Sequence, residues 1–330
     1  MQIVNRVTTR GAIQQFLMLL LYGIAAVAVA QPSYPTRSIR IVVANTQGST
    51  VDLVARQLGE QLAAQLGQAV VVINQPGAAG LVGAQTLARS ARDGYTLGFY
   101  GNTAVIAPHL QKVNYDPMQD ISTLAIVGNI PFAAVVPKTS RFRSLAQVMA
   151  AARSNPGGLK LGSAGSGTAI HLAAVQWQAI AAIDLLHVPY KGVAPMQTAL
   201  LGGDEIDIAF PTVGSVAALV KDGRLNALAM TGSQRSAVMP DVPTMQEIGL
   251  TKFVFESWLA LVAPSGLEPD VSEKLQRAVS SAVGTDAIKK LFADNSITPA
   301  LNTGADAQLV VQRDFEAMGL LLKKSGLLTQ

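Results

Sequence analysis

The sequence predicts an α/β protein with two lobes and a doubly wound sheet in each lobe. Three observations support this prediction: short β-branched runs alternate with helix-like segments, the same order recurs about 118 residues later, and the 330-residue chain exceeds the usual size of one hydrophobic core. Alternating strands and helices imply right-handed crossovers, which place the strands of each half side by side in one parallel sheet.

A β-α-β-α-β unit is predicted in the first half. Its strands are expected at residues 39–44, 70–73 and 95–100, and its helices at 51–66 and 79–90. Apolar residues recur at helical spacing from residue 51 to 66, and Gly67 is expected to end that helix.

The same unit is predicted again in the second half. Strands are expected at residues 159–163, 185–188 and 206–210, with helices at 169–182 and 194–201. The remaining C-terminal segment has helical patterns at 269–283 and 305–322 but no repeat partner, so we expect it to pack back on the first half.

The first 30 residues are predicted to form a cleavable secretory signal peptide. Arg6 and Arg10 precede an apolar stretch, and the small residues at 28–30 fit a cleavage site. That stretch is shorter than the roughly 18 to 20 residues that span a bilayer, which disfavours a membrane anchor. The mature chain would begin at Gln31 and fold in the bacterial periplasm.

Composition excludes several kinds of chemistry. The chain has no cysteine, so disulfides, thiolate nucleophiles and Cys-based metal sites are absent. The net charge of +4 includes the two arginines of the leader, and the rest is almost balanced, which disfavours a nucleic-acid partner. We expect no cofactor and no metal, because the three histidines have no metal-binding spacing.

Two loops are the candidate binding elements. The first loop (residues 46–50) and the second loop (residues 163–168) each connect the first strand of a half to its first helix, and both consist of small and polar residues. The first N–H groups of a helix lack partners within the helix and attract anions. We therefore expect the loops to clamp a carboxylate; the alternative is two ordinary turns in which Thr50 and Thr168 cap the helices.

Backbone donors rather than basic side chains are expected to hold the anion. Neither loop contains Lys or Arg, and the nearest basic residues, Arg56, Lys160 and Lys191, lie outside both. The expected donors are two threonine and two serine hydroxyls, the side-chain amides of Gln47 and Asn102, and the backbone N–H groups of Gly48, Ser49, Thr50, Gly165, Gly167 and Thr168. Asp52 could hold the first loop in shape or simply complement the helix dipole.

Other sites are less well supported. The second loop begins like a dinucleotide fingerprint but has Ile170 where the third glycine belongs. Ser163 and Ser166 lack the flanking glycines of a nucleophile elbow. His171 could support the second loop or touch ligand, whereas His187 is expected to be a hydrogen-bonded core residue.

Several motifs together resemble those of a known family. They are Tyr34-Pro35, Asn74-Gln75-Pro76-Gly77-Ala78-Ala79-Gly80, Asp93-Gly94-Tyr95-Thr96-Leu97, Tyr115-Asp116-Pro117, the second loop with His171, Val188-Pro189-Tyr190-Lys191-Gly192, Pro240-Asp241-Val242-Pro243-Thr244 and Trp258 with Leu261-Val262-Ala263-Pro264. The chain resembles the substrate-binding proteins of tripartite tricarboxylate transporters, the Bug family of periplasmic receptors. In the family's Pro-Phe-x-Pro-Gly-Gly-x-x-Asp loop, only Gly48 and Asp52 are kept here.

The resemblance implies a type II periplasmic binding protein, a Venus flytrap with its ligand between the lobes. It implies capture of a small carboxylic acid without catalysis and delivery to the permease subunits of a membrane transporter. Many relatives carry Asp after the position of Phe210, whereas this chain has Pro211, so an amino-acid ligand is less favoured. The expected ligand-binding residues are Gln47, Gly48, Ser49, Thr50, Asn102, Ser163, Ala164, Gly165, Gly167, Thr168, His171, Phe210, Pro211 and Thr212.

The expected domains are a signal peptide at 1–30, a first lobe at 36–130 plus 253–330, and a second lobe at 131–252 in a monomer. Two alternatives stay open. One is an exported α/β enzyme acting on a small acid, with Ser163, Thr168 or His171 in chemical roles. The other is a ligand-loaded sensor that docks on a signalling partner, which uses the same closure as a transport receptor.

Overall fold

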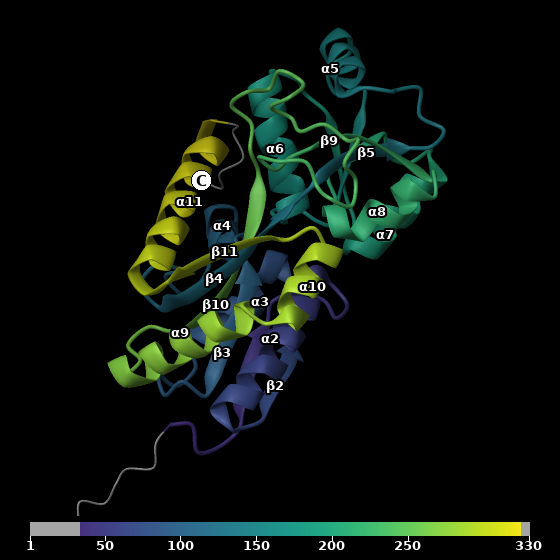
Figure 1. The fold of residues 1–330 in the computed structure, drawn as a ribbon. Coiled ribbons are helices and arrows are strands. Elements are labelled where there is room, and N and C mark those ends of the chain that lie inside the picture. The colour runs from purple at the N-terminus through teal and green to yellow at the C-terminus, as the bar shows by residue number, and fades with distance from the viewer. Residues whose placement is uncertain (1–33, 325–330) are drawn as a thin grey trace, which may run out of the picture. The chain divides into compact units, whose positions relative to one another are not determined.

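Two mixed β-sheets carry the fold (Figure 1). The structure is a computed structural model that describes residues 34–324, so the predicted signal peptide lies outside the described residues. The chain divides into two units, Met1–Thr36 and Arg37–Gln330, and all the helices and strands described below belong to the second.

The first sheet has six strands in the order β11-β4-β10-β3-β1-β2. The strands are β1 (Ile39–Val43), β2 (Val70–Asn74), β3 (Thr96–Gly101), β4 (Ile121–Pro131), β10 (Glu256–Pro264) and β11 (Thr298–Thr303). β1 pairs in parallel with β2 and β3, whereas β10 runs antiparallel to β3 and β4, and β11 antiparallel to β4. The C-terminal part of the chain therefore completes this sheet.

The second sheet has five strands in the order β7-β6-β8-β5-β9. The strands are β5 (Ala133–Pro137), β6 (Lys160–Ser163), β7 (Leu186–Pro189), β8 (Ile208–Ala209) and β9 (Leu225–Met230). β6 pairs in parallel with β7 and β8, and β5 is antiparallel to β8 and β9. In each sheet, three strands repeat the same parallel arrangement.

The predicted parallel units are confirmed, and the strands outside them, for which no pairing was predicted, run antiparallel. The chain leaves the first sheet through β4 and enters the second through β5, with only Phe132 between them. No crossover helix separates these two strands, and the chain returns through β10, which runs back beside β4. Antiparallel pairing follows from this direct passage and return.

Helices flank both sheets. They are α2 (Thr50–Leu66), α3 (Leu81–Ala88), α4 (Thr103–Ile106), α5 (Leu145–Ser154), α6 (Ala169–Ala181), α7 (Val193–Gly202), α8 (Val213–Lys221), α9 (Pro269–Val283), α10 (Asp286–Asp294) and α11 (Gly304–Lys324), with the 3-10 turns η1 (Ala78–Gly80) and η2 (Ala107–His109). α9 and α10 contact α2, and α11 lies along β4 (Figure 1). α2 ends as expected at Gly67, whose left-handed conformation lets its N–H donate to Ala63 O.

The two connections between the sheets are bonded to each other. Phe132 N–H donates to Thr231 Oγ1 at 2.8 Å, and Thr231 N–H donates to Phe132 O at 2.9 Å. Thr231 follows β9 and is fully buried, and its carbonyl accepts from Phe255 N–H just before β10. The outgoing and returning segments thus form one hydrogen-bonded unit.

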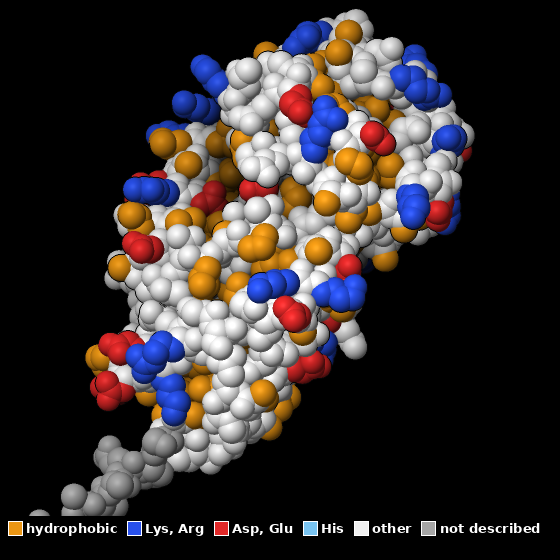
Figure 2. Space-filling view, viewed as in Figure 1, with side chains coloured by type: hydrophobic (Ala, Val, Ile, Leu, Met, Phe, Trp, Pro, Cys, Tyr) orange, Lys and Arg blue, Asp and Glu red, His pale blue; other side chains and the backbone are white. Residues whose placement is uncertain are grey.

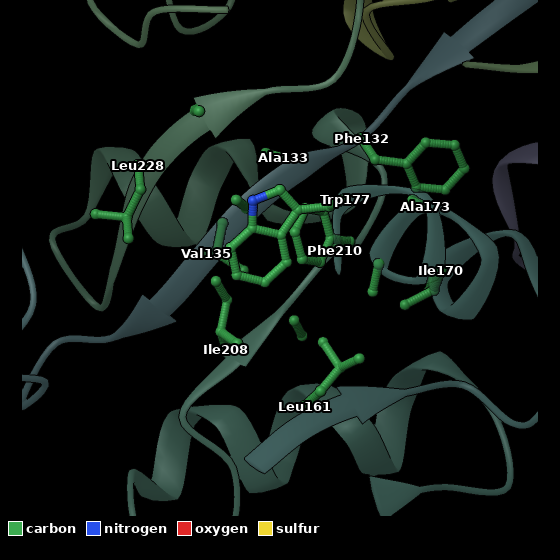
Figure 3. Packing of buried hydrophobic residues seen from close by; sticks show 14 of the residues in the cluster. Phe132, Ala133, Val135, Leu161, Ile170, Ala173, Trp177, Ile208, Phe210 and Leu228 are labelled. Atoms are coloured by element: carbon green, nitrogen blue, oxygen red, sulfur yellow. The ribbon is translucent and has the colours of Figure 1, made fainter. Parts of the chain in front are cut away.

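The core of the second sheet is built around Trp177 of α6 (Figure 3). Its ring and that of Phe210 lie with centroids 5.3 Å apart and tilted by 47°, a favourable aromatic arrangement. Both side chains are fully buried, and burying a Phe side chain contributes about 2 kcal/mol. α6, which carries the second loop at its start, is therefore anchored by its apolar face.

Charged side chains of both signs are spread over the face of the molecule in Figure 2, among neutral and hydrophobic ones. Among the described helices, none is both long and apolar enough to span a bilayer.

Candidate ligand-binding site

The residues predicted to bind ligand lie at the carboxyl ends of neighbouring parallel strands. The first loop follows β1 and Asn102 follows β3, its neighbour in the first sheet. The second loop follows β6, and residues 210–212 follow β8, its neighbour in the second sheet. This is the position at which open α/β sheets bind ligands.

The turns η1 and η2 link the two groups of residues. A Cβ on Gly167 of the second loop would lie 3.1 Å from Leu110 Cδ1 and 3.6 Å from Ala79 Cβ. A Cβ on Gly80 would lie 3.4 Å from both Ala44 and Ala104, which stand beside the first loop and Asn102. The structure therefore brings the two sets of loops together around η1.

The turn η1 has an unusual backbone, and no role for it was predicted from the sequence. Four consecutive residues from 77 to 80 have positive φ, and two of them, Ala78 at +47° and Ala79 at +55°, are not glycines. A left-handed conformation costs a non-glycine residue about 1 to 2 kcal/mol, and such strain is concentrated at functional sites. The glycines on either side of these alanines were the available signal, but nothing in the sequence indicates left-handed alanines.

Asp52 holds the first loop in shape. Its side chain, 1% exposed, accepts from Gly48 N–H at 2.8 Å and from Asn74 Nδ2 at 2.8 Å, and it pairs with Arg56 at 3.0 Å. Burial raises the pKa of Asp52, but the hydrogen bonds from Arg56, Gly48 and Asn74 outweigh burial, so the pKa lies below its ordinary value. Asp52 is therefore a buried, charged acceptor.

The start of α2, unlike that of α6, carries a side-chain cap. Ser49 is the N-cap, rather than Thr50, and its Oγ accepts from Asp52 N–H at 3.3 Å. The N–H of Ser49 donates to Thr46 O, and that of Gly48 donates to Asp52. Of the three backbone donors predicted in this loop, two have acceptors within the loop and helix.

The second loop is also internally bonded. Gly165 N–H donates to Ser163 Oγ at 3.1 Å, and Thr168 Oγ1 donates to Gly165 O at 2.7 Å. Gly167 N–H donates to His171 Nδ1 at 3.2 Å, and Thr168 N–H donates to Gly165 O at 3.3 Å. The three N–H groups predicted here therefore shape the loop in this conformation.

The start of α6 remains open. Thr168 stands at the N-cap position with extended backbone, but its side chain makes no cap because its hydroxyl is bonded to Gly165 O. The first N–H groups of a helix have no partners within it, so those of Ala169 and Ile170 are available for an anion. α8 likewise begins after Thr212 without a side-chain cap.

A serine and two histidines pack beneath the second loop. Ser163 Oγ and His187 Nε2 hydrogen-bond at 2.6 Å, and the rings of His187 and His171 are stacked with centroids 4.0 Å apart. Burial, and then the neighbouring His187, lower the pKa of His171 to about 4; burial also lowers the pKa of His187. Both imidazoles are therefore neutral at pH 7. His187 makes a hydrogen bond as predicted, but it is half-buried on the edge strand β7 rather than in the core.

Two predicted ligand-binding side chains have other partners. The Phe210 side chain lies in the core against Trp177 and is fully buried, so only its backbone is left for a ligand. The Asn102 side chain is 1% exposed, and its Oδ1 accepts from Ser257 Oγ at 2.8 Å. Phe210 thus extends the buried run of β8, in which Ile208 and Ala209 are also fully buried.

A cavity of about 1030 Å³ lies along α6, beside the second loop. Gly167 and His171 are the predicted site residues among those that line it, and His187 reaches it as well. The other walls come from the ends of η2, α5 and α11. In the described part of the chain, no three potential metal ligands come together.

The fold and this site define a two-lobed periplasmic binding protein, and comparisons with known proteins agree. Residues 54–327 match the "Tripartite tricarboxylate transporter family receptor" family, so the chain belongs to that family. It is 31% identical over 307 residues to Protein BugT of Bordetella pertussis, covering 92% of this chain and 94% of BugT. A protein from the gbd 5' region of Cupriavidus necator is 35% identical over 279 residues, covering 84% of each chain.

Solved structures of similar proteins show the same fold. The periplasmic binding protein BugD has 28% identity and a TM-score of 0.81, covering 90% of this chain and 100% of its own. Rpa4515 of R. palustris with adipate has 26% identity and a TM-score of 0.82, covering 89% and 98% of the two chains. MatC of Rhodopseudomonas palustris with malate has 26% identity and a TM-score of 0.79, covering 88% and 100%.

Proposed function

We propose that this protein captures a small carboxylic acid between its lobes in the periplasm and delivers it to the permease subunits of a tripartite transporter. Family membership supports the transport role, and the adipate and malate bound to Rpa4515 and MatC support the ligand class. The observation that carries the proposal is the uncapped start of α6 beside the second loop.

The two loops contribute unequally in this proposal. α2 is capped by Ser49 and already holds the carboxylate of Asp52, so its positive end is partly neutralised. α6 and α8 start without side-chain caps, and their first N–H groups are the stronger anion donors. The first loop would then add the exposed Gln47 side chain and the N–H of the half-buried Thr50 to complete the contact.

A binding role fits better than the open enzyme alternative. Ser163 is fully buried, and its Oγ is held by both His187 and Gly165, so it is not presented to a substrate. Thr168 Oγ1 is bonded to a backbone carbonyl, and His171 Nδ1 accepts from the backbone. The sensor alternative uses the same binding step and differs only in the partner.

The ligand can be tested by a thermal-shift screen. The protein is unfolded to strip bound ligand, refolded and screened against mono-, di- and tricarboxylates and amino acids. A ligand at 100 times its Kd adds about 2.7 kcal/mol of stability, so a true ligand stands out. A response to amino acids alone, or to no acid at all, would contradict the carboxylate assignment.

The place of the anion can be tested with Thr168→Asp. Aspartate at the N-cap puts a carboxylate on the start of α6, so we expect stability to be kept and carboxylate binding to be lost, as measured by calorimetry. Ser144→Asp, at the side-chain-capped start of α5 outside the proposed site, is the matched control and should bind as the wild type does. Lys191→Ala should also bind normally; its failure to bind would indicate a direct ion pair instead.

The glycines are poor sites for that test. Gly165 has φ +123° and Gly48 has φ +77°, so Gly165→Val would strain the backbone with or without a ligand. Ser163→Ala would disturb the bonds to His187 and Gly165 rather than remove a ligand contact alone.

Export is tested separately. Intact-mass analysis of protein from the periplasmic fraction should show an N-terminus at or near Gln31. Recovery of the full-length chain from the membrane fraction would contradict the predicted signal peptide.

A further inference from the structure

We propose that His171 is a positioning residue for the second loop, which it holds by accepting a backbone hydrogen bond that only the neutral imidazole can accept. This inference rests on the proposed function, because the loop it positions is the one expected to hold the ligand. His171 itself need not touch the ligand.

The hydrogen-bond geometry fixes which ring nitrogen must be free of a proton. Gly167 N–H points at His171 Nδ1 at 3.2 Å, and a backbone N–H can only donate. Nδ1 must therefore be unprotonated, which leaves the ring proton of the neutral form on Nε2. Protonation of Nδ1 would set two donors against each other and break the contact with Gly167.

The surroundings of His171 favour the neutral form from three sides. The residue is 7% exposed. Its ring stacks on that of His187 with centroids 4.0 Å apart, so a second positive charge there is unfavourable. It also lies in the first turn of α6, where the helix dipole disfavours a cation.

The charged groups that line the same cavity are Arg153 from α5, Asp184 before β7 and Lys324 from α11.

His187 completes the arrangement from β7. It bonds Ser163 Oγ, which in turn accepts from Gly165 N–H, so the stacked rings support both ends of the loop. Tyr190 N–H donates to Ser163 O at 2.9 Å and ties the loop to the end of β7. The side chains beneath the loop therefore fix its shape, while the first N–H groups of α6 keep no side-chain cap and can bind a ligand.

The first test needs no ligand. Nitrogen-15 NMR of the imidazoles at pH 7 should show His171 neutral, with its proton on Nε2. A proton on Nδ1, or a charged imidazolium, would overturn the proposal. On acidification, the Gly167 amide signal should shift with a midpoint near pH 4 in the wild type and in the control His109→Asn, because His109 instead donates to Phe315 O on α11. It should not titrate in this way in His171→Asn.

The second test measures binding of malate and adipate by calorimetry. His171→Asn places Oδ1 the same number of bonds from the backbone as Nδ1, so it keeps the acceptor and should bind within about twofold of the wild type at pH 7. His171→Leu leaves the Gly167 N–H unpartnered and should weaken binding about tenfold. Folding of each variant is checked by circular dichroism.

The pH profile separates this role from the ligand's own protonation. Both proteins meet the same ligand, so the ratio of wild-type to His171→Asn affinity should be flat near pH 7 and fall toward pH 4. A ratio that stays constant, or a folded His171→Leu that binds as tightly as the wild type, would overturn the positioning role. If neither acid binds the wild type, the carboxylate proposal fails for these ligands, while the NMR test still decides the role of His171.

Discussion

Asp52 shows how one residue determines the shape of a binding loop. Three donors from different parts of the chain converge on it, namely the Gly48 N–H, Asn74 Nδ2 and the Arg56 guanidinium. The backbone N–H of Asp52 donates to Ser49 Oγ, so both its backbone and its side chain are hydrogen-bonded to the first loop. The first loop therefore depends on a charged group that no ligand reaches directly.

Replacing Asp52 with Ala should lower the free energy of unfolding by about 2 kcal/mol, because buried donors lose their acceptor. The folded-state pKa of Asp52 lies below its unfolded value of 3.8, so its stabilisation is present above that pH and is lost as the pH falls below it. Urea unfolding at pH 7 and pH 3 measures both effects. The difference between the wild type and Asp52→Ala should be smaller at pH 3, and an equal difference would contradict this assignment.

At the scale of elements, η1 joins the two sets of loops through a strained backbone. Ala79 lies against Gly167 of the second loop, and Gly80 packs between Ala44 and Ala104. Gly80 itself has φ +97°, a left-handed value that glycine adopts without strain. The alanines of the turn carry a conformational cost that glycine would not.

Ala78→Gly should therefore raise the free energy of unfolding by about 0.5 to 1 kcal/mol, since relief of the left-handed cost exceeds the entropy that glycine gains in the unfolded chain. Ala150→Gly in the exposed middle of α5 is the matched control and should lower it by about 1 kcal/mol. Denaturant unfolding compares the two variants. Equal destabilisation by both would show that residue 78 is not strained.

Elements whose sequence pattern lies within one short segment were predicted, whereas pairing between distant segments was not. The repeated parallel strands and α2, α6 and α9 follow from periodicity and glycine punctuation, and their bounds lie within about two residues of expectation. β10 was not predicted as part of the first sheet, because its continuous apolar run carries no alternation to indicate a partner. The stacking of His109 on Phe315 of the distant α11 has no local signal in the sequence either.

The site shows the same division. Its location follows from topology alone, since loops at the carboxyl ends of parallel strands share one edge of a sheet. The side chains that accept the loop N–H groups could not be predicted from topology. The bonds from Gly167 to His171 and from Gly48 to Asp52 depend on the side-chain conformations of the folded protein. The burial of Phe210 likewise depends on its contact with Trp177 of α6, which is distant in the sequence.

At the scale of the whole described unit, elements of the two sheets also meet away from the loops. A Cβ on Gly214 of α8 would lie 2.8 Å from Asn295 O, at the turn between α10 and β11. Ser236 Oγ, which follows β9, and Ser296 Oγ hydrogen-bond at 2.6 Å in the same region. Closure around a ligand would have to keep or restore these contacts.

Gly214→Ala should therefore weaken ligand binding by about tenfold, because the added methyl group separates the two halves in their contacting state. Gly202→Ala is the control, since a Cβ at that position meets nothing within 4 Å. Calorimetry gives the affinity, and small-angle scattering should show a smaller radius of gyration with ligand in the control but less change in Gly214→Ala. Identical behaviour of the two variants would rule out a role for this contact.

The open start of α6 has a consequence for how the protein is handled in solution. A helix end with spare N–H groups does not distinguish strongly among small anions, so sulfate and phosphate should occupy it as a carboxylate does. Affinities measured in phosphate buffer should then be weaker than those measured in a chloride buffer of equal ionic strength. The choice of buffer would thereby set which ligands a screen can detect.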